Sequence, residues 1–263
     1  MKTNIFFRNK TFQAWVWLVV LLLVWELVAR FGLVNPHLLP PFSKVLVNMV
    51  TEISAGRLWI QTLNTLQMIL VGFVLSLVMA SVFAALSMWF PLVESLFNML
   101  NAIMNPLPAV AIMPLIIIWF GINTGAMLAM IVHGVFWALF QHLMDGLRTV
   151  VPTYREWGRN IGLSPPRMFT DIMAFAIMPA FLSGARVGWS RSWRNLISAE
   201  MIFGMIGNLG GLGFYIYMSR AFANITNVMS GVLIIIIIGI LVESLLFTQI
   251  EKHTIRRWGM THE

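Results

Sequence analysis

Residues 63–89 read LNTLQMILVGFVLSLVMASVFAALSMW, an apolar stretch without a charged side chain. A helix needs about 20 such residues to cross the roughly 30 Å hydrocarbon core of a bilayer. Backbone groups that face lipid find no hydrogen-bond partner there, which favours a helix over any open structure. The stretch therefore predicts a transmembrane helix.

The composition of the whole chain agrees with a membrane protein. Of its 263 residues 59% are hydrophobic and only 10% are charged, whereas a soluble domain has about 25% charged residues. This excludes an ordinary soluble enzyme and a disordered chain. The net charge of +7 is spread too thinly for a nucleic-acid interface, so no nucleic-acid partner is expected. With no Cys, disulfides and thiolate metal sites are excluded.

Six apolar runs are long enough to be spans, which predicts an all-α integral membrane protein that forms a single domain over residues 1–263. The predicted spans are residues 12–31, 63–89, 106–122, 126–144, 174–203 and 228–247. The first run follows Lys2, Arg8 and Lys10, as in a signal peptide, but its flank Val28-Ala29-Arg30 lacks a cleavage pattern. We therefore interpret it as an uncleaved span.

Six spans place both termini on one side, and the distribution of Lys and Arg indicates which side. Basic loops favour the cytoplasm. With both ends inside, ten basic residues are cytoplasmic and four are outside: Lys2, Arg8, Lys10, Arg148, Arg155, Arg159, Arg167, Lys252, Arg256 and Arg257 against Arg30, Lys44, Arg57 and Arg220. We therefore expect cytoplasmic termini and a cytoplasmic 145–173 segment. The segment 32–62 then lies outside, where Ser43 is expected to cap a short helix over residues 44–53.

The segment 145–173 is the most polar part of the chain. Pro152 can begin a helix, on which Tyr154, Trp157 and Ile161 share one face. Gly162 is expected to end that helix in the left-handed conformation, and Pro165-Pro166 redirects the chain into a second amphipathic piece over residues 168–173. The pair of helices is either a knob that receives force from a soluble partner or a basic loop held by lipid headgroups.

These residues resemble the EAA motif of the permease subunits of binding-protein-dependent ABC importers. Glu156, Gly162 and Ile172 occupy the motif's Glu, Gly and Ile positions. Trp157-Gly158 replaces its Ala-Ala, and Ala174-Phe175 replaces its Leu-Pro, whereas the proline that follows is present as Pro179.

Other motifs along the chain are similar to the nitrate/sulfonate/taurine/bicarbonate branch of that family. They are Leu39-Pro40-Pro41, Pro106-Leu107-Pro108, Pro114-Leu115, the run from Ile118 to Ile122, Gly184 with Arg186, Ala199-Glu200-Met201, Gly211-Leu212-Gly213, and residues 256–260. The resemblance implies a MetI-like type I importer permease fold with cytoplasmic coupling helices, in a bacterial inner membrane.

The resemblance also implies partners. A cytoplasmic ABC ATPase dimer would bind ATP and Mg²⁺, a second permease copy would complete the pore as a homodimer, and a periplasmic or lipid-anchored binding protein would deliver the solute. This chain would bind no cofactor and would not be an enzyme, because none of its lysines lies in a phosphate-binding loop. The residues implied to couple to the ATPase are Glu156, Trp157, Gly158, Arg159, Asn160 and Gly162.

The fifth span carries the candidate translocation path. Polar groups inside a span usually face a cavity or a partner. Arg186, Trp193 and Glu200 recur every seven residues and share a stripe, with Ser190 beside it. We expect this stripe to line the path of a small, anionic solute of the sulfonate, nitrate or taurine kind, attracted by Arg186 or Arg194. The alternative is a structural role for Arg186 and Glu200.

Two further segments allow alternatives. Asn105, Pro106 and Pro108 open the third span, where a proline-broken helix can form a gate or a simple helix start. The segment from Gly204 to Gly213 can pack over the path or serve as a flexible connector. No metal site is expected, because His133 and His142 are nine residues apart and face opposite ways.

The rival functions have weaker support in the sequence. A secondary transporter or channel needs no coupling segment and often shows inverted repeats, and none is visible. An intramembrane enzyme is disfavoured because Ser192 replaces the second Gly of a G-x-S-x-G elbow around Ser190.

Overall fold

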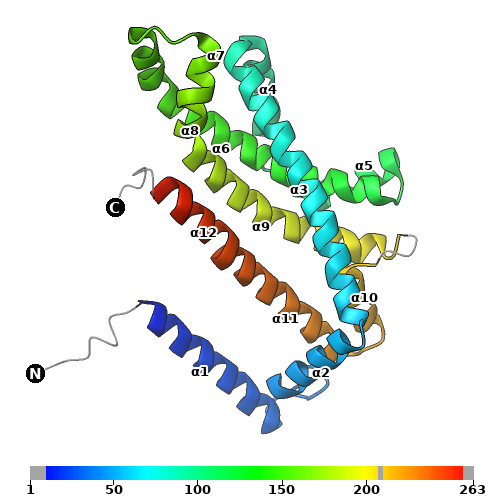
Figure 1. Ribbon diagram of the computed structural model, residues 1–263. Coiled ribbons are helices and arrows are strands. Elements are labelled where there is room, and N and C mark those ends of the chain that lie inside the picture. The colour runs from blue at the N-terminus through cyan, green and yellow to red at the C-terminus, as the bar shows by residue number, and fades with distance from the viewer. Residues whose placement is uncertain (1–9, 207–209, 257–263) are drawn as a thin grey trace, which may run out of the picture. The chain divides into compact units, whose positions relative to one another are not determined.

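The computed structural model describes residues 10–206 and 210–256, and most of them are helical (Figure 1). The chain divides into two compact units, Met1–Ile60 with Tyr215–Ile234 and Gln61–Phe214 with Ile235–Glu263. Each unit is described by itself.

The predicted spans are present as helices, although two of them are bent. Within the described residues four helices are long and apolar enough to cross a membrane, or six if each bent pair counts as one span. The four single helices are Phe12–Arg30, Arg57–Trp89, Thr124–Thr149 and Ile225–Thr254. The bent pairs are Pro91–Met104 with Ala109–Phe120, at 109°, and Thr170–Ala176 with Met178–Phe203, at 46°.

The first unit holds α1 (Lys10–Arg30), α2 (Phe42–Ser54), most of α10 (Leu212–Ala221) and the first part of α11 (Ile225–Leu241). The Trp25 ring packs on Phe42 at 5.2 Å, and its Nε1 donates to the Pro40 carbonyl. Asn48 of α2 donates to Asn227 and to Ser230 of α11. Small polar side chains thus bring α2 and α11 together.

The prediction that Ser43 caps the short outside helix is wrong. The helix begins at Phe42, its N-cap is Pro41, and no side chain caps it. The Ser43 N–H and hydroxyl instead donate to Glu26, which also pairs with Arg30. The Glu26 carboxylate, near the end of α1, therefore accepts a hydrogen bond from a backbone N–H in the first turn of α2.

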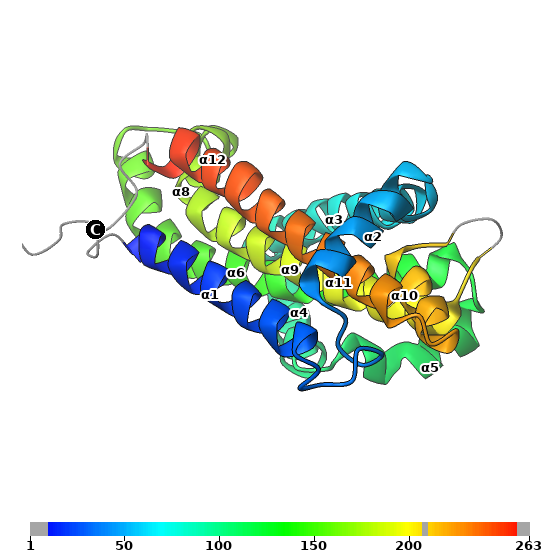
Figure 2. The ribbon, with the colours of Figure 1, turned by 90° about the horizontal axis from the view of Figure 1, so that it is seen from below.

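The core of the second unit lies where α6 (Thr124–Asn160) packs along α9 (Met178–Phe203), as Figure 1 and Figure 2 both show. Glycines permit the close approach. A Cβ added at Gly184 would lie 2.7 Å from Leu139, and one at Gly188 would lie 2.8 Å from Val135. Similarly, Gly72 of α3 (Arg57–Trp89) lies against Ile131 of α6.

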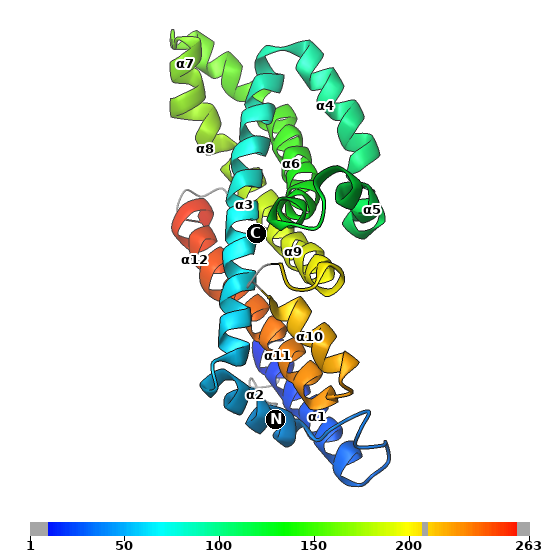
Figure 3. The same ribbon diagram turned by 90° about the vertical axis from the view of Figure 1, so that its right-hand side faces the viewer.

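The third predicted span, residues 106–122, is shorter and bent. α5 covers Ala109–Phe120 and is preceded by α4, Pro91–Met104, a helix that the sequence analysis did not identify. The two meet at 109° (Figure 3). Phe97 of α4 stacks on Phe83 at 4.3 Å and contacts Phe140 at 5.6 Å. This aromatic cluster attaches α4 to α3 and α6.

The remaining elements connect and close the second unit. α7 (Pro165–Met168), a π-helical turn (Phe169–Met173) and α8 (Ala174–Ala176) lead from α6 into α9. After α11 the chain continues through a π-helical stretch (Val242–Phe247), α12 (Thr248–Glu251) and a last π-helical turn (Lys252–Arg256). The helical stretch that contains the last predicted span, residues 228–247, is therefore longer than that span.

Candidate functional site

The C-terminal end of α6 carries the predicted coupling residues. The expected helix start at Pro152 is wrong, because α6 runs without interruption from Thr124 to Asn160. The expected end is confirmed: Gly162 has φ +73°, and the Leu163 N–H donates to the Gly158 carbonyl at 2.9 Å. This six-residue bond over a left-handed glycine is the Schellman arrangement that ends helices.

The apolar face predicted near this end is open in the structure. Trp157 is 69% exposed, Ile161 is 70% exposed, and Tyr154 is also exposed. Glu156 and Asn160 are exposed beside them. The Arg159 side chain lies outside the described residues. Exposed apolar side chains that lie together can take part in an interaction with another molecule.

The segment that follows supports this end of α6. Gly158 and Met168 are both buried, and a Cβ added at Gly158 would lie 2.9 Å from Met168 Cε. Met168 and Met173 belong to the core cluster that includes Phe140 and Leu147 of α6. The second amphipathic piece is thus an anchor, and the exposed face of α6 stands on it.

The two sides of α9 differ in burial, which the sevenfold spacing alone did not predict. Trp193 and Glu200 are buried, whereas Ser190 and Arg194 are exposed. Within the second unit the predicted stripe therefore separates into interior residues and an open polar side.

Arg186 is neutralised within the chain. Its Nε lies 3.1 Å from Glu243 Oε1, and its NH2 group lies 3.1 Å from Glu251 Oε2. Its guanidinium also lies 5.8 Å from the Phe247 ring centre. This arrangement attaches α9 to the last helical stretch and favours the structural alternative for Arg186.

Asn105 and the prolines form the break between α4 and α5. Pro106 and Pro108 are exposed, and Pro108 is the N-cap of α5. Asn105 Oδ1 accepts a 2.8 Å hydrogen bond from Arg191 NH1. The His133 ring contacts the Leu107 carbonyl at 3.1 Å. The proline-broken segment is therefore tied to α6 and α9.

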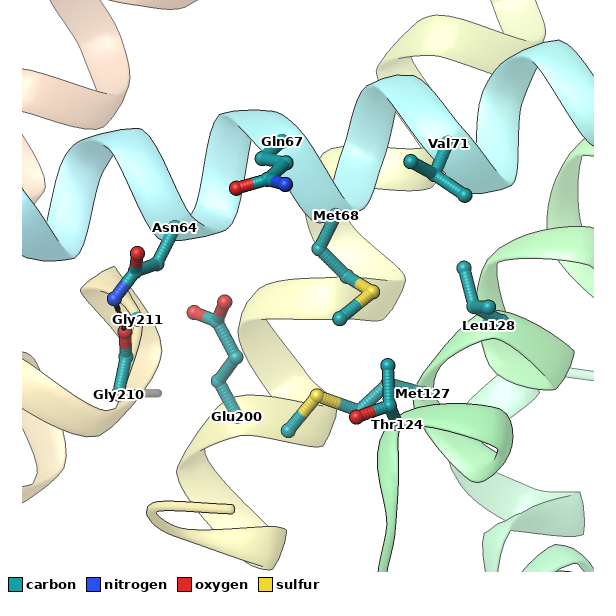
Figure 4. Close-up of a pocket in the computed structure, with 10 residues that line it drawn as sticks. All are labelled: Asn64, Gln67, Met68, Val71, Thr124, Met127, Leu128, Glu200, Gly210 and Gly211. Carbon is teal, nitrogen blue, oxygen red and sulfur yellow. Dashed lines mark hydrogen bonds between the residues drawn. The ribbon is translucent and has the colours of Figure 1, made fainter. Parts of the chain in front are cut away.

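Glu200 is the centre of a buried hydrogen-bond network and is only 3% exposed. Its carboxylate accepts from the Thr65 hydroxyl at 2.8 Å and from the Gly213 N–H at 2.8 Å. Asn64, close by on α3, donates to the Gly210 carbonyl at 2.7 Å (Figure 4).

The glycines of this network leave no room for side chains. A Cβ added at Gly211 would lie 2.0 Å from Glu200 Oε1, and one at Gly213 would lie 2.4 Å from the Ile197 carbonyl. Gly211 and Gly213 are therefore close-packed against α9, whereas a Cβ added at Gly210 would lie 2.7 Å from Gln61 Oε1 of α3. The described end of the glycine-rich segment is thus packed closely and is not a loose connector. The sequence signal was the glycine cluster, whereas nothing marked Thr65.

A cavity of about 200 Å³ adjoins Glu200. Figure 4 shows Met68, Met127 and Leu128 around it, with Thr124, Asn64 and Gln67 as the polar side chains near Glu200. Among the described residues no group of three or more His, Cys, Asp or Glu side chains could hold a metal ion.

Comparison with known proteins gives a consistent result. Residues 72–257 match the family model described as "Binding-protein-dependent transport system inner membrane component". The chain is 27% identical to the taurine transport system permease protein TauC of Escherichia coli K12, over 86% of this chain and 82% of that protein.

Two further relatives extend the comparison. A putative aliphatic sulfonates transport permease protein SsuC of Bacillus subtilis is 22% identical over 93% of this chain and 86% of its own length. The formylaminopyrimidine transport permease protein ThiX of Halalkalibacterium halodurans is 25% identical over 64% and 67%.

Proposed function

The chain belongs to the family of inner membrane components of binding-protein-dependent transport systems, and on this premise we propose how its residues serve an ATP-driven importer. As a permease subunit it is a multi-pass inner membrane protein that works with a separate ATPase and a substrate-binding protein. We assign the whole chain to one permease domain that binds no cofactor, and ATP and Mg²⁺ to the ATPase.

The coupling segment, residues 152–173, is proposed to dock the ATPase. The observation that supports this is the exposure of Trp157 and Ile161 on an α6 end anchored through Gly158 and Met168. Glu156, Arg159, Asn160 and Gly162 complete the segment. Trp157 stands where the family pattern has a small Ala, so we propose that it selects a dedicated ATPase partner.

The translocation path is proposed to follow the open side of α9, at the interface of two copies of this chain. Ser190 and Arg194 line it directly. Arg186, Trp193 and Glu200 act from within the fold by holding α9 in place. Asn105, Pro106 and Pro108, at the bent junction of α4 and α5, are the proposed gate.

The solute is proposed to be a small anion of the sulfonate class. Relatives named for taurine and aliphatic sulfonates support this choice. The relative named for a formylaminopyrimidine makes a neutral pyrimidine the second candidate.

Co-purification and transport test the proposal. The wild-type permease should bring an ATPase with it, and vanadate should block uptake. Trp157→Ala should lose the ATPase while the permease stays folded, because Trp157 makes little contact with its own chain. Leu33→Ala, at a residue 74% exposed elsewhere, is the matched control. Uptake that persists without any ATPase would contradict the proposal.

Orientation has a direct test because the chain has no Cys. A single Cys at Asn160 should react with an impermeant thiol reagent only from the cytoplasmic side, and a single Cys at His37 only from outside. The opposite labelling would overturn the proposal of cytoplasmic termini.

A further inference from the structure

Among the described residues, Arg30, Arg57, Arg148 and Arg186 pair with carboxylates, whereas Arg191 and Arg194 of α9 do not, and neither do Arg167 and Arg220, which lie outside the candidate spans. Ion pairs join Arg30 to Glu26, Arg57 to Glu52, Arg148 to Glu94, and Arg186 to both Glu243 and Glu251. Arg191 and Arg194 of α9 have no carboxylate within 4 Å among the described residues. The unbalanced charge of the spans is therefore concentrated on one turn of α9.

This dibasic turn lies at the middle of its helix. Arg191 comes thirteen residues after Met178 and twelve before Phe203, the ends of α9. At 1.5 Å per residue it lies about 18–20 Å from either end. A charge at that depth is costly unless it faces water or a partner. Lipid headgroups lie near the ends of the helix, too far away to serve as that partner.

The surroundings of the pair are polar but carry no negative charge. Arg191 NH1 donates to Asn105 Oδ1 at 2.8 Å, and Arg194 Nε reaches the Ser190 carbonyl at 3.4 Å. Ser190, Arg194 and Ser198 follow one another at four-residue spacing on the open side of α9. α5 packs on α9, and its positive N-terminal end begins at Ala109, four residues after Asn105.

The described residues of a second copy of this chain offer no spare acid for the missing charge. Five described acidic side chains are engaged in the ion pairs named above, and Glu200 is buried with its own hydrogen bonds. The other described acids lie in the 145–173 segment: Asp145, Glu156 and Asp171. The described residues thus hold no free carboxylate for the middle of α9, which favours a counter-ion from outside the permease.

We propose that Arg191 and Arg194 form a binding site for the acid group of the transported solute, which the two guanidinium groups recognise as a sulfonate or a similar singly charged oxyanion. Asn105 is a positioning residue that holds the Arg191 guanidinium. The inference rests on the proposed function. It assigns the anion role to Arg191, which the predicted stripe omitted, together with Arg194, and no longer to Arg186, which two carboxylates neutralise. Guanidinium groups pair with planar or tetrahedral oxyanions through parallel N–H donors.

Binding of methanesulfonate to the permease–ATPase complex tests the site. The complex is placed in nanodiscs of phosphatidylcholine only, which offer no anionic headgroup, and its thermal unfolding is followed as ligand is added. Methanesulfonate should raise the unfolding temperature, whereas the neutral isostere dimethyl sulfone should not. Arg191→Gln and Arg194→Gln should each raise the half-saturating concentration of methanesulfonate by about tenfold or more, because each loses a charged hydrogen bond.

Two controls make the outcome decisive. Arg220→Gln, on α10, should keep the wild-type response. In the wild-type complex, methanesulfonate should protect Arg191 and Arg194 from modification by phenylglyoxal, while Arg220 is modified as before. This control uses only the wild-type protein, so it does not depend on whether a variant folds. An unchanged affinity in both glutamine variants, or labelling of both arginines without protection, would overturn the site. Vanadate-sensitive uptake persisting in that case would leave the proposed function standing.

Discussion

The Thr65 hydroxyl donates to Glu200 Oε1 over 2.8 Å and accepts a hydrogen bond of the same length from the Leu212 N–H. One small side chain on α3 thus joins α9 to the start of α10. Glu200 is buried and forms no ion pair with a described arginine or lysine, so its hydrogen bonds are its main compensation for lost solvation.

Thr65→Val should therefore destabilise the permease without changing its shape. The substitution leaves the Leu212 N–H unpaired and takes one donor from Glu200, which should cost about 1–3 kcal/mol. Thermal unfolding in detergent measures this loss of stability. Thr65→Ser keeps the hydroxyl and should lie close to the wild type. Equal stability of the valine and serine variants would show that the hydroxyl has no structural role.

Gly211→Ala should prevent the glycine-rich segment from closing on α9. The added methyl group would lie 2.0 Å from a Glu200 oxygen that is already fixed by hydrogen bonds. We expect a loss of about 3 kcal/mol or more, within the range of severe overpacking. Gly239→Ala is the control, because no atom lies within 4 Å of its added Cβ. That variant should be neutral or slightly more stable.

The sequence alone predicted some of these features and could not predict others. The apolar runs predicted the long helices, because lipid leaves few alternatives to a helix. α4 was missed because Glu94 and Asn98 interrupt its apolar run. The close-packed glycine segment was recognised as a feature, but Thr65 lies 135 positions before Glu200. No local pattern could pair the two.

The same limit applies to the α9 stripe and to Pro152. A sevenfold spacing places residues on one face, but only the packing around α9 shows that Trp193 and Glu200 are interior. Pro152 favours a helix start by its missing N–H, yet α6 continues through it. At an end of the helix where neighbouring residues are exposed, water can satisfy the carbonyl that loses its donor.

Arg186→Met should affect stability more than solute affinity. Its two carboxylate partners hold α9 against the last helical stretch. Because the guanidinium is partly exposed, the loss should be about 1 kcal/mol. The half-saturating concentration for uptake should stay within about twofold of the wild-type value. A large rise in that concentration, with normal assembly, would return the anion role to Arg186.

The Glu52–Arg57 pair should give a pH-dependent contribution to stability. Hydrogen bonds from Arg57, at 2.8 Å for Nε, hold the pKa of Glu52 below its ordinary value of 4.5. A lowered folded-state pKa stabilises the fold above the unfolded-state pKa, and this contribution disappears as the pH falls through the folded-state pKa.

Comparison of wild type with Glu52→Gln should reveal that contribution. The difference in unfolding temperature should be constant from pH 7 to about pH 5 and should shrink below it. Thr51→Ala, an exposed neighbour on the same helix, should show no such trend. A difference that grows on acidification would reverse the assigned sign.

Gly162→Val should uncouple the permease from its ATPase. A β-branched residue is strained at the φ of +73° found there, so the Schellman end should open and shift the exposed face of Trp157 and Ile161. Gly162→Asn should retain coupling, because asparagine tolerates this conformation. ATPase retention on the purified permease and vanadate-sensitive uptake are the measurements.

Gly56 provides the matched control for that experiment. Its φ is +80°, and like Gly162 it has open space around an added Cβ. Gly56→Val therefore introduces the same kind of backbone strain in the turn between α2 and α3, outside the coupling segment. It should lower the unfolding temperature comparably and keep the ATPase bound. If both valine variants lost the ATPase equally, general destabilisation would explain the effect, and the coupling role of the α6 end would be wrong.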